Sequence, residues 1–179
     1  MKKLVIFVVG LLVSVGMCAQ SKVYFTREIT PEALVRIYKA LGREAKGRVA
    51  VKISTGEAGG HNYLKPELIR NLVDEVGGTI VECNTAYAGS RNTSAAHWKT
   101  IRQHGFDKIA KVDIMDEHGD MRIPVKDTTH IKYDIVGASL ANYDFMVNLA
   151  HFKGHAMGGF GGVLKNLSLI HISEPTRPY

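Results

Sequence analysis

A glycine-rich segment with interspersed histidines and lysines is the part of the chain best suited to chemistry. It covers residues 148–166 and reads NLAHFKGHAMGGFGGVLKN, with five glycines. Ordering glycine costs backbone entropy, so this density indicates a backbone that turns tightly or closely approaches another group. Lysine and histidine side chains beside exposed backbone N–H groups are typical of an anion or metal pocket. A flexible surface loop with incidental charge is the alternative interpretation.

The histidines and lysines of this segment suggest more than one chemistry. His151 and His155 are four residues apart, which on a helix would place both on one face as metal ligands. Gly154 between them argues against a helix, so metal ligation, hydrogen bonding to an anion and a structural role all stay open. Lys153 and Lys165 can neutralise a carboxylate or a phosphate, or simply remain solvated.

The elements that must position these residues follow a strand, loop, helix pattern. Helices are predicted to begin at Thr30-Pro31, at Pro66 and near Thr93, where capping residues or prolines precede apolar residues at helical spacing. Runs rich in β-branched residues predict buried strands over 48–53, 79–85, 108–115 and 145–149. Shorter strands are expected at 21–25, 121–125 and 130–135, the second at an edge because of Pro124. The pattern predicts an α/β fold with a largely parallel sheet and helices on both faces.

Three loops are expected to meet at one edge of this sheet, because ligands of parallel sheets bind at the carboxyl ends of the strands. The loops are 54–63, 86–92 and 150–166. Arg91 suits bidentate contact with an anion, and Glu57 suits either a general base or a residue that orders its loop. The candidate ligand-binding residues are Lys52, Arg91, Gly158, Gly159, Gly161, Gly162, Lys165 and Asn166, and the candidate catalytic residues are Glu57, His151, Lys153 and His155.

The N-terminus reads as an export signal. Lys2 and Lys3 precede an apolar stretch over 4–15, and small residues lead to a cleavage site between Ala19 and Gln20. Residues 1–19 are therefore predicted to be a signal peptide of a periplasmic or otherwise extracytoplasmic protein. The apolar stretch is too short for a membrane span, and no stable span is expected after cleavage. Acylation of Cys18 is the alternative, which the bulky Met17 disfavours.

Charge and cysteine content narrow the function classes. Losing Lys2 and Lys3 with the signal lowers the formal charge from +6 to +4, and no contiguous Lys/Arg run remains. Nucleic-acid binding is therefore not expected, whereas a small anionic ligand suits the balance. Of the two cysteines, only Cys83 would remain, which excludes an intrachain disulfide and a four-cysteine metal site.

Three ordered motifs resemble a known family. They are KISTGE at 52–57 with Tyr63 and Pro66, ECNTAYAGSR at 82–91, and the set HFKGH, GGFGG and Lys165-Asn166 in the glycine-rich segment. Together they resemble the DUF362 family of uncharacterised iron–sulfur-centre proteins over residues 22–167. The resemblance implies that fuller members continue beyond this point and often carry four cysteines for a 4Fe–4S cluster. This chain has no such run, so its own residues are not expected to bind that cluster.

The end of the chain does not fit the resemblance. Residues 168–179 include two prolines among the last five positions, which excludes regular structure there. We expect this tail to be non-native and the fold to be incomplete at its C-terminus, with a genuine disordered tail as the alternative. Two functions stay open. One is an exported redox-associated enzyme domain for a small anionic substrate, and the other is a non-catalytic module that holds an anion or a metal.

Overall fold

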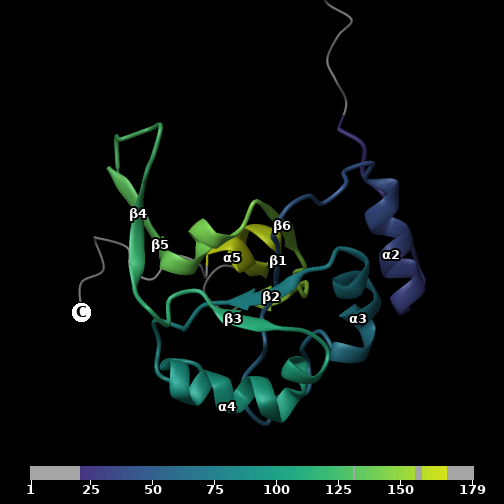
Figure 1. Ribbon diagram of the computed structural model, residues 1–179, viewed down its shortest axis with the longest axis horizontal. Coiled ribbons are helices and arrows are strands. Elements are labelled where there is room, and N and C mark those ends of the chain that lie inside the picture. Colours follow the sequence, from purple (N-terminus) through teal and green to yellow (C-terminus); the bar gives the residue numbers. More distant parts are fainter. Residues whose placement is uncertain (1–20, 131, 156–158, 169–179) are drawn as a thin grey trace, which may run out of the picture.

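A parallel four-stranded sheet forms the centre of the computed structural model, which describes residues 21–130, 132–155 and 159–168. The strands are β1 (Val49–Lys52), β2 (Thr79–Glu82), β3 (Val112–Ile114) and β6 (Phe145–Asn148), in the order β3-β2-β1-β6. β1 is buried along its whole length, which explains its run of small and β-branched residues. The predicted α/β fold with a parallel sheet is confirmed (Figure 1).

Helices α3 (Pro66–Glu75) and α4 (Ser94–His104) cover one face of the sheet. Their residues Ile69, Val73 and Ile101 pack with strand residues such as Val51 and Ile80 in one buried cluster. Helix α2 (Pro31–Ala40) packs on the outside of α3. The predicted starts of α2 and α4 are confirmed, because the Thr30 and Thr93 hydroxyls accept hydrogen bonds from the backbone N–H three residues later.

The other face of the sheet is covered by a 3₁₀ helix and a β-hairpin. Ala50, Val81, Cys83 and Met115 form a second buried cluster there with Val136. The hairpin consists of β4 (Asp120–Pro124) and β5 (Tyr133–Gly137), which pair antiparallel and extend away from the sheet in Figure 1. The 3₁₀ helix η2 (Ala138–Asn142) follows β5 directly.

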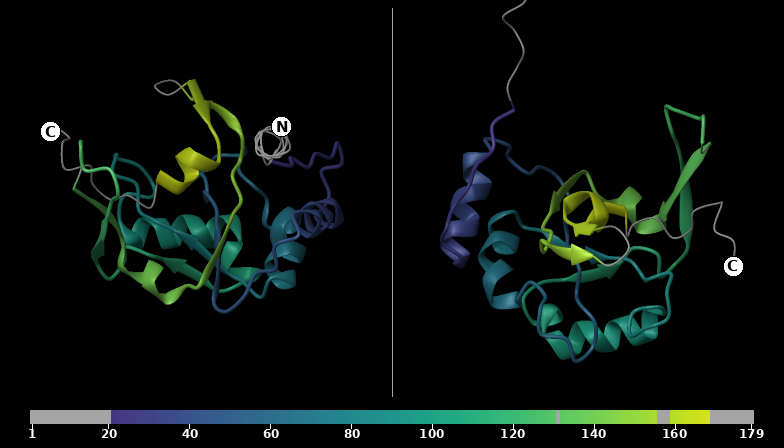
Figure 2. Two further views of the ribbon diagram at one scale, coloured as in Figure 1. Left: turned by 90° about the horizontal axis from the view of Figure 1, so that it is seen from above. Right: turned by 180° about the vertical axis from the view of Figure 1, so that it is seen from behind.

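The C-terminal part of the described chain lies beside the ends of β1 and β6. It contains the antiparallel pair β7 (Lys153–His155) and β8 (Gly159–Gly161), followed by helix α5 (Val163–Ser168). In the left view of Figure 2, the pair β7–β8, in yellow, projects beyond the sheet.

One sequence prediction of local structure is wrong, and one predicted strand is shorter than expected. Residues 21–25 form no strand. The strand expected over 108–115 is limited to 112–114, because Gly105 adopts a left-handed conformation and starts the 3₁₀ helix η1 (Phe106–Lys108). Among the described residues, no helix has the length and apolar character needed to cross a bilayer.

Candidate functional site

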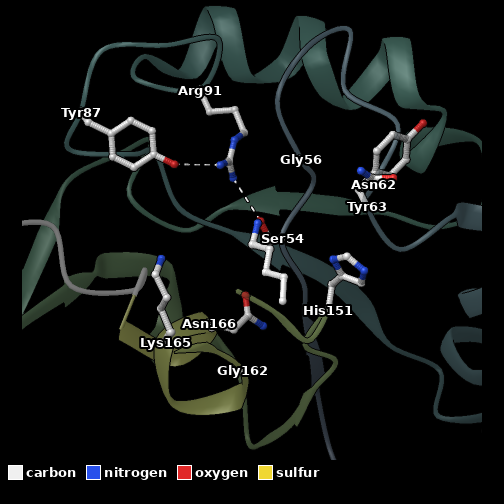
Figure 3. A pocket seen from close by; sticks show the side chains of 12 residues that line it. Ser54, Gly56, Asn62, Tyr63, Tyr87, Arg91, His151, Gly162, Lys165 and Asn166 are labelled. Atoms are coloured by element: carbon white, nitrogen blue, oxygen red, sulfur yellow. Dashed lines mark hydrogen bonds between the residues drawn. The ribbon is translucent and has the colours of Figure 1, made fainter. Parts of the chain in front are cut away.

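A small pocket opens where β1, β2 and β6 end, and two parts of the chain line it. The sheet side contributes residues that follow β1 and β2, and the C-terminal side contributes residues from the segment after β6 (Figure 3). The sheet side is Ser54, Gly56, Asn62, Tyr63, Tyr87 and Arg91, and the C-terminal side is His151, Lys153, Gly161, Gly162, Lys165 and Asn166. The pocket encloses about 60 Å³, far below the roughly 300 Å³ at which pockets for drug-sized ligands begin.

Arg91 lines the pocket, but the protein already uses all five of its N–H donors. Nε and Nη2 donate to Glu57 Oε1 at 3.0 and 2.6 Å, and Nη2 also donates to the Tyr87 hydroxyl at 3.2 Å. Nη1 donates to Glu82 Oε1 at 2.9 Å and to Ser54 Oγ at 3.4 Å. An arginine has five N–H groups in total, so this guanidinium has no unused donor for a ligand.

A buried ion pair lies beneath the pocket. Lys52 and Glu82 are both fully buried, and Lys52 Nζ lies 2.7 Å from Glu82 Oε2. Lys52 also donates to the carbonyl of Ile53 at 2.7 Å, and Asn166 Oδ1 lies 3.5 Å from the same ammonium. The structure therefore places Lys52 below the pocket rather than among its lining residues.

Glu57 fastens the loop after β1 to the loop after β2. Its carboxylate accepts from Arg91, from the Ser90 hydroxyl at 2.8 Å and from the Tyr87 hydroxyl at 3.3 Å. Partial burial opposes ionisation, but the hydrogen bonds and the Arg91 charge outweigh it and hold the pKa of the Glu57 carboxyl below its usual value. A carboxylate with a lowered pKa is a weak base, and Glu57 is outside the pocket lining.

Asn166 fastens the C-terminal side to the sheet. Its side-chain Nδ2 donates to Asn148 Oδ1 at 2.7 Å and lies 3.4 and 3.5 Å from the backbone oxygens of Lys52 and Leu149. These groups are at the ends of β1 and β6, so α5 is held at the edge where the strands stop. This attachment carries Lys165 to the pocket.

Lys153 and Lys165 both line the pocket, and both lie close to Gly161. Lys153 pairs with Gly161 across the β7–β8 ladder. A Cβ at Gly161 would lie 3.4 Å from Lys165 Cδ and 3.6 Å from Lys153 Cγ, which are ordinary van der Waals distances, so both lysine stems run beside this glycine. Within the described part of the chain, the side chains of His151 and Lys153 form no hydrogen bond or ion pair.

Of the remaining predicted site residues, only some line the pocket. Gly162 lines the pocket, and a Cβ there would meet the Phe160 ring at 2.7 Å. Gly159 has a positive φ of 66° at the start of β8 and is outside the lining. Gly158 and the side chain of His155 are outside the described residues, so the proposed His151–His155 metal pair stays a prediction. Among described residues, no group of three or more His, Cys, Asp or Glu side chains is arranged to hold a metal ion.

Sequence reasoning missed Glu82 and Ser54. The sequence places Ser54 just after β1 and Glu82 at the end of β2, but their roles emerge only once β1 and β2 are known to be neighbours. Charged residues of opposite sign at the ends of neighbouring buried strands, here Lys52 and Glu82, have to pair.

A buried histidine supports the loops that form the sheet side. His97 of α4 is fully buried, with Nε2 3.0 Å from the Thr55 hydroxyl and Nδ1 3.2 Å from Asn84 Oδ1. Asn84 Nδ2 donates to Ser94 Oγ, which assigns Asn84 Oδ1 as the acceptor and therefore Nδ1 as the protonated nitrogen. Burial, together with the charges of Arg91 and Lys52, lowers the pKa of His97 to about 3.

The cysteines of this chain do not fit a 4Fe–4S cluster. Such clusters take four thiolates, and the sequence has two cysteines. Cys83 is buried in the second hydrophobic cluster, and burial raises the pKa of its thiol well above the usual range. This thiol is therefore a packing group of the core.

Comparison with known proteins identifies a family for this chain. No curated protein and no solved structure matches the chain. The sequence model of one family, described as a domain of unknown function (DUF362), matches residues 49–177. The match spans the central sheet, the loops of the sheet side and the C-terminal side of the pocket. The chain belongs to the DUF362 family.

Proposed function

We propose that this domain binds a small oxyanion, a carboxylate or a phosphate group, in the pocket at the strand ends. One observation carries the proposal. Lys153 and Lys165 come from two different elements and line the same pocket as Arg91, and no described lining residue is an Asp or a Glu.

The charges beneath the pocket favour this assignment. Lys52 and Arg91 are cations whose charge is balanced by the carboxylates of Glu82 and Glu57. The positive charge that Lys153 brings to the pocket is therefore not cancelled by the charges beneath it, which already balance one another. In a partly desolvated pocket, that charge attracts an anion more strongly than it would in water.

The size of the pocket limits what it can hold. Its volume of about 60 Å³ is a fraction of the roughly 300 Å³ at which pockets for drug-sized ligands begin. The pocket therefore takes the charged group of a ligand, and the rest of a larger molecule remains outside it. If the domain serves a redox reaction, as its resemblance to iron–sulfur-centre proteins suggests, these residues bind and orient an anionic substrate, since they do not hold the cluster.

Isothermal titration calorimetry of the purified chain with sodium phosphate and sodium acetate tests the proposal. We expect one equivalent of at least one anion to bind, with an affinity that falls as ionic strength rises. The double variant Lys153→Gln/Lys165→Gln should weaken binding by at least tenfold.

The matched control is Lys46→Gln/Lys99→Gln, which removes the same charge at two exposed lysines outside the pocket lining. This control should bind within twofold of the wild type. The proposal fails if neither anion binds at millimolar concentration. It also fails if the control variant loses as much affinity as the site variant. Binding would then depend on the net charge of the protein and not on the two lysines in the pocket.

We further propose that the protein is exported, with residues 1–19 removed as a signal peptide. The basic start at Lys2 and Lys3, the apolar stretch over 4–15 and the small residue Ala19 support this proposal. Mass spectrometry of the protein from its native cell should identify Gln20 as the N-terminal residue. Recovery of intact Met1 in a cytoplasmic fraction would contradict it.

A further inference from the structure

Ser54 has a hydroxyl group that acts as the acceptor toward a neighbouring cation. Ser54 lines the pocket and accepts a hydrogen bond from Arg91 Nη1 at 3.4 Å. A guanidinium can only donate, so Ser54 Oγ is the acceptor in this contact and its own hydrogen points elsewhere. No described residue accepts that hydrogen. Figure 3 shows Ser54 between Arg91 and His151, at the centre of the lining residues.

Arg91 is fixed in place by groups other than a ligand. Its side chain is 5% exposed, with Glu82 on Nη1 and Glu57 on Nε and Nη2. Breaking these contacts would leave a buried charge without its partners, which costs several kcal/mol in proteins. Arg91 is therefore expected to keep its contacts when a ligand arrives, instead of turning toward it.

We infer that Ser54 is the neutral hydrogen-bond donor to the bound oxyanion and that Arg91 is a positioning residue that aims this hydroxyl. The inference rests on the proposed function. Accepting a hydrogen bond from a cation polarises the hydroxyl and strengthens it as a donor. Ser54 thus complements the lysines of the C-terminal side from across the pocket. Arg91 contributes through Ser54 and makes no direct bond to the ligand.

Phosphate titrations of Ser54→Ala, Ser54→Thr, Arg91→Lys and the double variant Ser54→Ala/Arg91→Lys test this inference. Ser54→Ala should weaken binding about tenfold, the size expected for a hydrogen bond to a charged group. Ser54→Thr keeps the hydroxyl and should stay within threefold of the wild type. Arg91→Lys cannot hold both carboxylates and the serine, so it should also weaken binding about tenfold.

The double variant separates a positioning role from direct contact. If Arg91 acts through Ser54, Arg91→Lys should cost less than twofold once the hydroxyl is absent. A further tenfold loss in the double variant would show that Arg91 touches the ligand itself and would overturn the inference. Wild-type affinity in Ser54→Ala would overturn it as well.

A control variant and a folding check accompany these titrations. Ser139→Ala removes a hydroxyl from η2 on the other face of the sheet and should bind phosphate like the wild type. If Arg91→Lys fails to fold by circular dichroism, the comparison of Ser54→Ala with Ser54→Thr still decides the role of the hydroxyl. Failure of the wild type to bind any oxyanion would instead refute the proposed function, so the two failures are distinguishable.

Discussion

Each oxygen of the Glu82 carboxylate accepts a hydrogen bond from a different cation. Oε1 accepts from Arg91 and Oε2 accepts from Lys52, and all three residues are buried. Burying charges costs solvation energy, which their mutual attraction offsets only when the geometry is good. Glu82 is therefore an organising residue of the site, although it does not line the pocket.

We expect Glu82→Gln to destabilise the protein by about 3–5 kcal/mol, since it leaves the Lys52 ammonium buried without its counter-ion. The double variant Lys52→Met/Glu82→Leu removes both charges at similar volume and should recover most of that loss. Arg91 still has Glu57 as a partner in this variant. Urea denaturation measures both free energies of unfolding. A double variant that is less stable than Glu82→Gln would contradict this account.

His97 should make the stability of the protein depend on pH. Its pKa is about 3 in the folded protein and 6.5 ordinarily, so between these values the unfolded chain binds a proton that the folded protein does not. The stabilisation is complete above pH 6.5 and is lost as the pH falls toward 3, by about 1.4 kcal/mol per pH unit. From pH 7 to 5, this one group should lower the free energy of unfolding by about 2 kcal/mol.

Comparing two histidine variants by urea denaturation at pH 5 and pH 7 tests this expectation. His97→Gln removes the titrating group and should reduce the difference between the two pH values by about 2 kcal/mol. His118→Gln replaces an exposed histidine and is the matched control, with which the effect of His97→Gln is compared. Equal pH dependence in His97→Gln and the wild type would show that another group is responsible.

At the scale of elements, the sequence predicts the helices and central strands well because their signals are local. Thr30 with Pro31 starts α2, Pro66 starts α3, and the β-branched run in β1 is buried as expected. Because ligands bind where parallel strands end, the sequence also predicts that Arg91 and Lys165 belong to the same site. The structure places both in the lining of one pocket.

The burial of each side chain and its partners could not be predicted from such local signals. From the sequence, Lys52 and Arg91 are predicted to contact a ligand because both are cations near a strand end. Their actual partners, Glu82 and Glu57, depend on which strands are neighbours and on how two loops meet. Those are long-range contacts with no local signal. The arm at 21–25 has strand-like composition but no pairing partner, and composition alone does not make a strand.

Helix α5 depends on Asn166 for its position. The helix has six residues, and helices this short are not stable without tertiary contacts. Asn166→Leu should therefore speed hydrogen exchange of backbone amides in β7, β8 and α5 while leaving β1 and β2 protected. Asn71→Leu, which loses only an exposed contact to Glu32 on α2, should leave exchange in the C-terminal segment unchanged. Uniformly faster exchange after Asn166→Leu would indicate global destabilisation instead.

At the scale of the whole molecule, the pocket lies between two parts of the fold that are stabilised by different contacts. The sheet side is anchored by the core and by the ion pairs beneath it. The C-terminal side is a small hairpin and a short helix whose side-chain hydrogen bonds to the strand ends run through Asn148 and Asn166. An anion bound between them would connect the less supported part to the better supported one.

Ligand binding should therefore stabilise the whole domain and protect both sides of the pocket together. At a phosphate concentration of 100 times Kd, mass action adds about 2.7 kcal/mol, which raises Tm by roughly 5–10 °C for a chain of this size. Hydrogen exchange should slow both in the loops 54–63 and 86–92 and in β8 and α5. Lys153→Gln/Lys165→Gln should reduce both effects at the same phosphate concentration, because the anion loses its contacts on the C-terminal side. Protection confined to the loops of the sheet side would mean that the ligand does not bridge the pocket, and the lysines would then have no direct part in holding it.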